Sequence, residues 1–263
     1  MFDGQVAVIS GSAVGIGAGI ALGLAARGVD IVGLDIDQEA NKGTAEKVRK
    51  LGRKALALEC DVGDPAQVKS AFDHTLKTFG RIDILVNNAA LWLDCSLTSG
   101  SYESQTQAFA RSMNSCALGS YHCARAAVPA MQKGGGGNIV NIITEHIKEG
   151  HLITGMPASG YDCAKWSQWR LTQTWAVELK KHKIRVNALC MGATDTPMLR
   201  GLWKGDPPAD FARTWMRPEQ IGQQLIDLLA EGPGGRTGEN IGAWVGEPVQ
   251  LGPRKPAHRS VTG

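Results

Sequence analysis

The sequence predicts an α/β fold, in which one doubly wound parallel sheet carries helices on both of its faces. Three observations support this prediction. Short apolar runs recur along the chain without polar alternation, as in strands that are buried on both faces of a parallel sheet. Amphipathic helical patterns separate these runs. The first run leads directly into a glycine-rich turn and another helical pattern.

Seven apolar runs are the predicted strands, and most of them are rich in Val, Ile and Leu. They begin at Val6, Ile31, Ala55, Ile82, Asn138, Ile184 and Ile241. The helical patterns run from Gly17 to about Gly28, follow Asp37 and Pro65, precede Met131, and extend over about 159–182 and 218–229. No interdomain linker interrupts this alternation, so residues 1–263 are expected to form a single domain.

Glycine and proline mark the expected ends of these helices. Gly28, Gly52 and Gly80 each follow a helical pattern, as glycines that end helices do. Pro65 and Pro218 suit the first turn of a helix. The four glycines at 134–137 are expected to form a loop between a helix and a strand.

Composition narrows the possible functions. The 28 basic and 25 acidic side chains give a net charge of +3, too small and too dispersed to indicate nucleic acid or a membrane as a partner. The six cysteines are scattered without a C-x-x-C pair, which argues against a disulfide framework and against a metal site. No signal-peptide pattern and no apolar run of membrane-spanning length are present, so a cytoplasmic location is expected.

The turn after the first strand reads SGSAVGIG and places glycines at 11, 15 and 17, with Ser12 and Ile16 between them. Glycine lets the backbone turn tightly and approach a pyrophosphate, and the N-terminus of the next helix offers its N–H groups to the anion. A glycine cluster alone is weak evidence. Here the strand before it and the helix after it predict a dinucleotide site.

Asp35 ends the second strand. An acid at this position can accept hydrogen bonds from the ribose hydroxyls of an adenosine, and it repels a 2′-phosphate. Residues 12–14 are Ser-Ala-Val and Ile36 follows the acid, so no Arg or Lys is placed to receive a phosphate. The sequence therefore predicts NAD rather than NADP. The alternative is an Asp that caps the next helix, a role that Asp37 could take instead.

Polar residues also end the third and fourth strands, at Asp61 (followed by Val62) and at Asn87 and Asn88. The carboxyl ends of neighbouring strands form the binding crevice of such a sheet. Farther along, Tyr161 and Lys165 are four residues apart, so a helix places them on one face. Taken alone, this pair would be interpreted as packing, with a half-buried Tyr beside a solvated Lys.

Together these motifs resemble the short-chain dehydrogenase/reductase family. The similarity rests on SGSAVGIG, Asp35, DV at Asp61, NNAA at Asn87, YDCAK at Tyr161 and IRVNALCMGATDTPM at Ile184, and it extends to about Gly246. It implies a seven-stranded Rossmann-type sheet, a nicotinamide cofactor, a small-molecule alcohol or ketone as substrate, and a homotetramer or homodimer.

The resemblance assigns roles position by position. Tyr161 and Lys165 match the family's catalytic pair. The implied cofactor-binding residues are Gly11, Ser12, Gly15, Ile16, Gly17, Asp35, Ile36, Asp61, Val62, Asn88, Tyr161, Lys165, Thr194 and Thr196. Three further segments are expected within the catalytic domain: a substrate loop at about 145–160, a lid at about 197–217, and a C-terminal tail at about 250–263.

The family also places a catalytic Ser at the end of the fifth strand, where this chain has Thr144. Counting the family's usual spacing back from Tyr161 reaches Lys148 instead, which cannot fill the role. Strand position fixes geometry and loops absorb insertions, so Thr144 is the predicted third catalytic residue and Ser159 a weaker candidate.

Further departures leave some roles open. Met191 replaces a usual Pro, and Ala90 replaces a usual Gly. The family's proton-relay Asn lies three residues before a Gly. Gly119 would then select Cys116, whereas Asn114 lies two residues earlier. Either the helix is locally irregular here, or the relay is altered.

In this family the Tyr acts as acid or base. Free Tyr ionises at about pH 10, so a base that works near neutrality needs a lower pKa. Lys165 is expected to lower the pKa of Tyr161 and to hold the nicotinamide ribose, while Thr144 orients the substrate oxygen. The expected reaction is NAD-dependent oxidation of a secondary alcohol to a ketone. The alternatives are a ketone or 3-oxoacyl reductase, and a nonenzymatic NAD(H)-binding sensor or scaffold.

Aromatic residues suggest what the substrate is like. The lid and the loop after the fourth strand carry Trp92, Trp203, Phe211 and Trp215. They predict a bulky, cyclic or aromatic substrate, or else they pack the lid or a subunit interface. His146 and His151 could contact a polar substrate group or be solvated. The basic residues within 180–185 are expected to be a solvated helix end.

Overall fold

The computed structural model describes residues 2–147, 158–203, 205–245 and 250–254. Within them, seven parallel strands form one sheet in the order β3-β2-β1-β4-β5-β6-β7. The strands are β1 (Val6–Ser10), β2 (Asp30–Asp35), β3 (Ala55–Glu59), β4 (Ile84–Asn87), β5 (Gly137–Thr144), β6 (Ile184–Met191) and β7 (Asn240–Ala243). Each predicted apolar run forms a strand, and the predicted single doubly wound α/β domain is confirmed.

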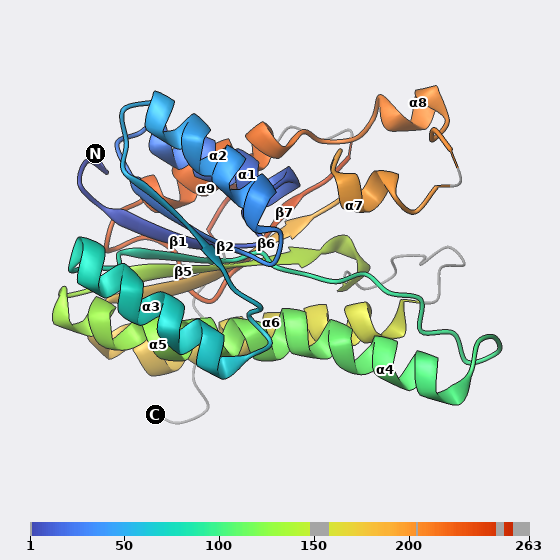
Figure 1. Cartoon of the computed structure of the whole chain (residues 1–263). Coiled ribbons are helices and arrows are strands. Elements are labelled where there is room, and N and C mark those ends of the chain that lie inside the picture. The colour runs from blue at the N-terminus through green and yellow to red at the C-terminus, as the bar shows by residue number, and fades with distance from the viewer. Residues whose placement is uncertain (1, 148–157, 204, 246–249, 255–263) are drawn as a thin grey trace.

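Helices cover both faces of the sheet (Figure 1). One face carries α1 (Gly15–Ala25), α2 (Gln38–Lys50) and α9 (Pro218–Ala230). The other carries α3 (Pro65–Phe79), α4 (Tyr102–Met113), α5 (Gly119–Lys133) and α6 (Ser159–Leu179). Two short helices, α7 (Pro197–Arg200) and α8 (Ala209–Ala212), follow β6 and extend beyond the sheet. The helices α4, α7 and α8 were not among the separate helices expected from the sequence.

Each face of the sheet has its own apolar core. Ile20 and Leu225 pack in the core under α1 and α9, and Phe72 and Met131 pack in the core under α3 and α5. The central strands β1, β4 and β6 are wholly buried. The edge strands β3 and β7 are partly exposed, so the prediction of burial on both faces is wrong for them. An edge strand lacks a neighbour on one side and is less completely covered.

Backbone geometry supports the predicted helix ends. Gly28, Gly52 and Gly80 have φ values of +93°, +79° and +72°. In this left-handed region glycine carries no Cβ penalty. Pro65 and Pro218 begin α3 and α9, as expected. These boundaries follow from local backbone chemistry, which explains why the sequence could predict them.

Arg185 corrects the prediction that residues 180–185 are a solvated helix end. It is only 5% exposed because β6 carries it inward. Its guanidinium donates to the carbonyl oxygens of Leu228 (3.1 Å) and Leu229 (3.2 Å), which lie in the last turn of α9. The last carbonyls of a helix lack partners within the helix, and Arg185 supplies one.

The first part of the predicted tail is fastened to the domain. Arg236 is 7% exposed and donates to the carbonyl oxygens of Leu251 (3.0 Å) and Gly252 (3.3 Å). Residues 255–263 of this tail, and residues 148–157 of the predicted substrate loop, lie outside the described residues. Over the part of the chain that is described, no helix has the length and apolar character needed to cross a membrane.

The strand order positions a crevice. β1 lies between β2 and β4, so the chain turns to one side of the sheet after β1 and to the other side after β4. The loops at the carboxyl ends of these two strands therefore diverge, and open α/β sheets bind ligands at this point.

Candidate active site

The turn between β1 and α1 is closed by tight backbone contacts. Gly11 and Gly15 have φ values of +65° and +57°, a region that favours glycine. A Cβ on Gly17 would collide with the carbonyl oxygen of Gly11, and a Cβ on Gly11 would lie 2.9 Å from Cα of Ala89. All three glycines are therefore required by the shape of the turn itself.

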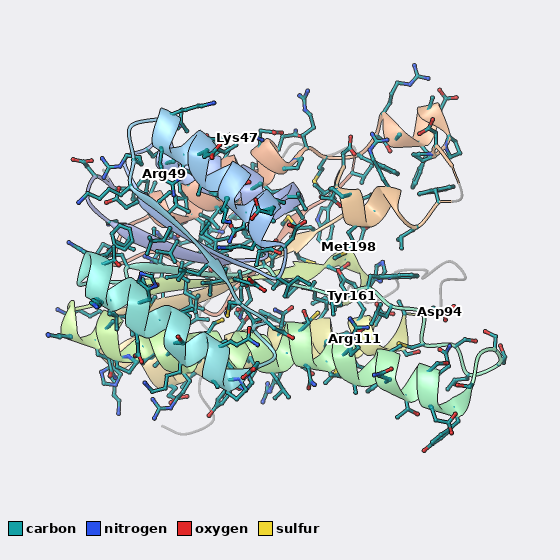
Figure 2. All side chains as sticks on the ribbon, in the orientation of Figure 1. Lys47, Arg49, Asp94, Arg111, Tyr161 and Met198 are labelled. Atoms are coloured by element: carbon teal, nitrogen blue, oxygen red, sulfur yellow. The ribbon has the colours of Figure 1, made fainter. Side chains whose placement is uncertain are left out.

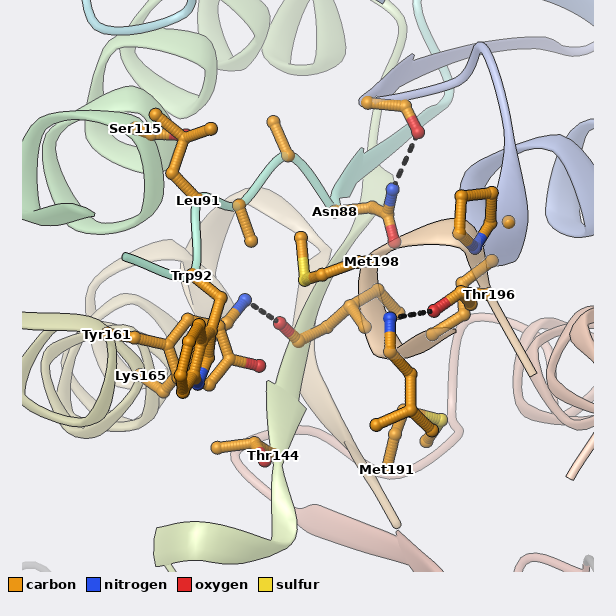
Figure 3. A pocket seen from close by; sticks show the side chains of 18 of the residues that line it. Asn88, Leu91, Trp92, Ser115, Thr144, Tyr161, Lys165, Met191, Thr196 and Met198 are labelled. Atoms are coloured by element: carbon orange, nitrogen blue, oxygen red, sulfur yellow. Dashed lines mark hydrogen bonds between the residues drawn. The ribbon is translucent and has the colours of Figure 1, made fainter. Parts of the chain in front are cut away.

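Asn88, just after β4, links this turn to the neighbouring strand β4 through hydrogen bonds. Its Nδ2 donates to the carbonyl oxygens of Ser10 (3.0 Å) and Gly11 (2.8 Å) (Figure 3). The Ser10 hydroxyl accepts in return from the backbone N–H of Asn88 and of Ala89, each at 3.0 Å. The predicted polar residue of the fourth strand thus shapes the glycine turn.

Asp35 fixes the other side of the turn. One of its carboxylate oxygens accepts from the N–H of Ala13 (2.9 Å) and the other from the N–H of Asp37 (3.0 Å). Asp37 itself caps α2 by accepting from the N–H of Ala40 (3.0 Å). The capping role thus belongs to Asp37, which leaves Asp35 facing the crevice beside Ile36.

A cavity of about 870 Å³ runs from this turn to the lid. Among the predicted site residues, it is lined by Gly11, Gly15, Ile16, Asp35, Ile36, Asp61, Val62, Asn88, Thr144, Tyr161, Lys165, Thr194 and Thr196. Ser12 and Gly17 do not line it. The Ser12 hydroxyl instead donates to Oδ1 of Asn41 (2.9 Å), and Gly17 is buried inside the turn. The fold of the turn therefore directs Ser12 and Gly17 away from the cavity.

Tyr161 and Lys165 share one face of α6, as the spacing predicts. The Lys165 ammonium lies 5.5 Å from the centre of the Tyr161 ring and donates to the carbonyl oxygen of Ile142 (2.7 Å) (Figure 3). Lys165 is only 2% exposed, so this is not a solvated lysine beside a packed tyrosine. The geometry contradicts the packing interpretation of the pair.

Thr144 ends β5 and lines the cavity with Tyr161, where its hydroxyl partly opposes the rise in the pKa of Tyr161. Ser159, the weaker candidate, is exposed in the first turn of α6 and does not line the cavity. Lys148 lies outside the described residues. The structure therefore brings Thr144, and not Ser159, together with the Tyr–Lys pair.

Burial dominates the electrostatics of the pair. It raises the pKa of Tyr161 well above its ordinary value, and the hydrogen bond from Thr144 opposes this shift only partly. Burial also lowers the pKa of Lys165. For the protein chain by itself the net shift of the Tyr161 pKa is therefore upward, opposite to the lowered pKa expected from the sequence, because desolvation of the phenolate is its largest cause.

Comparison of the whole chain with known proteins identifies its family. Residues 5–207 match the family model described as "short chain dehydrogenase". The chain belongs to the short-chain dehydrogenase family. It is 33% identical to the trans-4-hydroxycyclohexanecarboxylate dehydrogenase of Sinomonas cyclohexanicum, over 92% of each chain. It is 30% identical to a 3-oxoacyl-(acyl-carrier-protein) reductase of Thermotoga maritima, over 91% of this chain and 96% of the relative.

Solved structures of this family share the fold. The carveol dehydrogenase of Mycobacterium avium, solved in complex with NAD, superposes with a TM-score of 0.81 and is 28% identical. The match covers 93% of this chain and 97% of that one. This short-chain dehydrogenase is thus an oxidoreductase of a family that uses NAD or NADP.

A π-turn settles which residue lies beside the predicted catalytic pair. The turn at Asn114–Leu118 joins α4 to α5, so the helix is locally irregular. Cys116 is fully buried and packs with Ala164 and the Tyr161 ring. The Cβ of Asn114 faces Gly63 instead, 3.5 Å from where a Cβ of that glycine would lie. A thiol therefore stands beside the pair, and Asn114 lines the cavity elsewhere.

The lid end of the cavity is walled by aromatic residues. Trp92, Trp203 and Phe211 line it, and Phe211 also stacks edge-on with Trp215, with ring centres 5.6 Å apart. Trp215 is 6% exposed and does not line the cavity. The packing alternative is therefore correct for Trp215, whereas the other three face the cavity.

Several lining residues had no signal in the sequence. Arg111 from α4 lines the cavity (Figure 2), in addition to the predicted Tyr161 from α6 and to Met198 from α7, which lies in the predicted lid. The other lining residues that were not predicted include Gly63, Asp64, Leu91 and Ser115, whereas Glu145, Leu199 and Leu202 belong to the predicted substrate loop and lid. They come from loops and short helices whose course depends on tertiary contacts.

Proposed function

We propose that this chain is an NAD-dependent dehydrogenase that oxidises a secondary alcohol on a bulky, cyclic or aromatic frame to a ketone. One observation carries the proposal: Thr144, Tyr161 and Lys165 meet at the aromatic end of a cavity whose other end carries Asp35. Relatives and neighbours named for ring alcohols, the hydroxycyclohexanecarboxylate and carveol dehydrogenases, support a cyclic substrate.

The residues at the end of the cavity that carries Asp35 fit a dinucleotide. The glycine turn leaves no room for a Cβ at Gly17 and presents the N-terminus of α1 to the cavity, as phosphate binding requires. Asp35, Asp61 and Asp64 line the cavity, and the cations of its described lining, Arg111 on α4 and Lys165 on α6, come from neither the glycine turn nor the turn after β2. This set of acids favours the free hydroxyls of NAD over the 2′-phosphate of NADP.

The chain's own residues then handle the substrate oxygen. When bound, the nicotinamide supplies the hydride acceptor and a positive charge. Thr144 donates a hydrogen bond to the alcohol oxygen, and the Tyr161 phenolate takes the proton of the alcohol as its O–H bond breaks. The buried Lys165 ammonium stabilises the phenolate and is placed to hold the ribose of the cofactor.

The reverse reaction uses the same groups, with Tyr161 giving the proton back. A relative named as a 3-oxoacyl reductase favours this second candidate, and the direction depends on which substrate the aromatic end accepts. Assembly as a homotetramer or homodimer remains a prediction from the family resemblance.

NADH formation by the purified protein tests the proposal. The substrates are linear, cyclic, aromatic and steroidal secondary alcohols, with Tyr161→Phe as the test variant. General acid–base catalysis contributes about 10² to 10⁴ in rate, so Tyr161→Phe is expected to lower kcat by about a thousandfold. Tyr121→Phe, on the exposed face of α5, is the matched control and should retain full activity.

Two outcomes contradict the proposal. Turnover that survives Tyr161→Phe removes Tyr161 from the reaction. Tight NADH binding without turnover of any alcohol favours the sensor or scaffold.

A further inference from the structure

Arg111 is a basic side chain of the cavity that the proposed hydride chemistry does not use. It lies in the last turn of α4, is exposed, and lines the cavity (Figure 2). Lys165, the other Arg or Lys of the described lining, is buried and donates to the carbonyl oxygen of Ile142 (2.7 Å). Arg111 is therefore the basic residue of this lining that can meet a negative charge carried in by a ligand.

The protein chain itself does not account for this charge. Within the described part of the chain, the Arg111 guanidinium has no hydrogen bond and no ion pair. A cation in the last turn of a helix can complement the free carbonyl groups there, but α4 continues through the π-turn at Asn114–Leu118 into α5. The N–H of Asn114 is bonded to the carbonyl oxygens of Ala110 and Arg111, so the helix exposes no end for the guanidinium to neutralise.

The face of α4 that carries Arg111 borders the adenosine end of the cavity. Asn114 and Ser115 follow at the i+3 and i+4 positions, share this face and also line the cavity. Asn114 lies against the turn after β3, where its Cβ is 3.5 Å from the place that a Cβ of Gly63 would take. The N–H of Gly63 donates to Oδ1 of Asp61 (2.8 Å). Arg111 therefore lies about one helical turn from the residues of the predicted adenosine site.

The segment after β4 separates the glycine turn from α4. The helix α1, which begins at that turn, covers one face of the sheet, and α4 covers the other (Figure 1). A Cβ on Gly11 would lie 2.9 Å from Cα of Ala89, and the next residue, Ala90, packs against the same apolar cluster as Met113 of α4. The glycine turn and α4 thus contact consecutive residues. An anion at the N-terminus of α1 therefore lies close to the side chains that α4 directs into the cavity.

The charges at this end favour one more cation. Asp35, Asp61 and Asp64 all line the cavity. A dinucleotide brings two negative phosphates past these carboxylates, and the N-terminus of α1 offers only the partial charge of its N–H groups. A guanidinium is planar and can give two parallel hydrogen bonds to phosphate oxygens. Arg111 can thus offset a repulsion that the glycine turn by itself offsets only in part.

We propose that Arg111 binds the pyrophosphate of the cofactor from the side opposite the glycine turn. The anion is then held between the N-terminus of α1 and the guanidinium on α4. This adds to the cavity a cofactor-binding residue that lies neither in the glycine turn nor at a strand end. The inference rests on the proposed function, because it takes NAD(H) as the ligand. Salt should weaken the contact, since Arg111 is exposed.

Fluorescence titration of the full chain with NADH measures this contact. Arg111→Met keeps most of the side-chain length and removes the charge, so the Kd for NADH is expected to rise about tenfold. Arg111→Lys keeps the charge without the planar fork, and its Kd should rise less. Added NaCl should weaken NADH binding more in the wild type than in Arg111→Met. Arg125→Met changes an exposed arginine of α5 outside the cavity lining, and this matched control should leave the Kd unchanged.

Fragments of the cofactor locate the contact. Competition with NADH gives the affinities of adenosine, ADP and ADP-ribose, of which only the last two carry a pyrophosphate. Arg111→Met should weaken the binding of ADP and ADP-ribose about tenfold and leave that of adenosine within about twofold. An equal loss for adenosine would mean that the guanidinium stacks on the adenine, and it would overturn the inference.

Two further results overturn the inference. One is a Kd for NADH that does not change in Arg111→Met. The other is a loss of kcat/KM confined to alcohols that carry a carboxylate, which would make Arg111 a substrate-binding residue. If Arg111→Met does not fold, the same titrations on Arg111→Gln decide. Failure of the proposed function looks different, because the wild type then oxidises no alcohol while NADH titration still tests Arg111. A wild type that binds no NADH contradicts both.

Discussion

The two ends of the cavity are built differently. At the adenosine end, short strands lead straight into a glycine turn and into Asp35, and backbone contacts fix the shape. At the substrate end, the walls come from Trp92 and Trp203, which lie on loops, and from Phe211, which lies in the short helix α8. The shape of the adenosine end is set by glycine backbone without side chains, and the shape of the substrate end is set by large side chains. A single added carbon should therefore disrupt the first end far more than a large deletion disrupts the second.

Among changes that compare the two ends, the largest expected effect comes from Gly17→Ala. The new Cβ would collide with the carbonyl oxygen of Gly11, which cannot move aside as a side chain could. We expect NAD affinity to fall by more than about a hundredfold and the free energy of unfolding to fall by about 2 kcal/mol. NADH fluorescence titration and urea unfolding measure the two effects.

Gly43→Ala is the matched control for Gly17→Ala. Gly43 lies within α2, and a Cβ there meets nothing within 4 Å. This variant should raise stability by about 0.5 kcal/mol, because alanine favours the helix, and leave NAD binding unchanged. Equal behaviour of the two variants would contradict the close contact at Gly17.

Asp35→Ser tests the specificity of the same end. Losing the charged acceptor should lower kcat/KM with NAD by about thirtyfold and leave kcat/KM with NADP unchanged or higher, since a charged hydrogen bond contributes about 2 kcal/mol. Asp37→Ser keeps a capping side chain on α2 and serves as the control. A ratio of NAD to NADP activity that does not change would remove Asp35 from cofactor selection.

The pH dependence of alcohol oxidation tests Tyr161 and Lys165, which lie where the cofactor and substrate ends of the cavity meet. Burial raises the pKa of Tyr161, so the phenolate is the minor form and its fraction grows about tenfold per pH unit. We expect kcat/KM for oxidation to rise with pH. The rise should end where Lys165 loses its charge, since burial lowers the pKa of that ammonium. A profile that is flat in the wild type would show that Tyr161 is not the titrating base.

The smallest effect is expected at the lid. Trp203→Leu removes one wall among several, so KM for a cyclic alcohol should rise by about threefold with little change in kcat. Trp166→Leu, on the exposed surface of α6 and outside the cavity, is the matched control. A loss of kcat as large as that of Tyr161→Phe would mean that the lid contributes to the chemical step and not only to substrate binding.

The same contrast explains what the sequence could predict. Gly11, Asp35 and the Tyr161–Lys165 spacing are local features at strand ends or on one helix face, and the structure places all of them in one cavity. The position of Cys116 was left open because it depends on a π-turn, which the sequence pattern does not reveal. Arg185 was misplaced for a similar reason: its carbonyl partners in α9 are more than 40 residues away. The direction of the Tyr161 pKa shift could not be predicted either, because it depends on burial, which the spacing of residues in the sequence does not reveal.

The bridge from Asn88 to the glycine turn has a consequence for how ligands bind. Two carbonyl oxygens and one hydroxyl already have their partners in the protein chain, so the turn has its final shape before any ligand arrives. Association of a dinucleotide then costs little conformational entropy at this loop. A preformed first site of this kind favours a compulsory order of addition, with the cofactor bound before the alcohol.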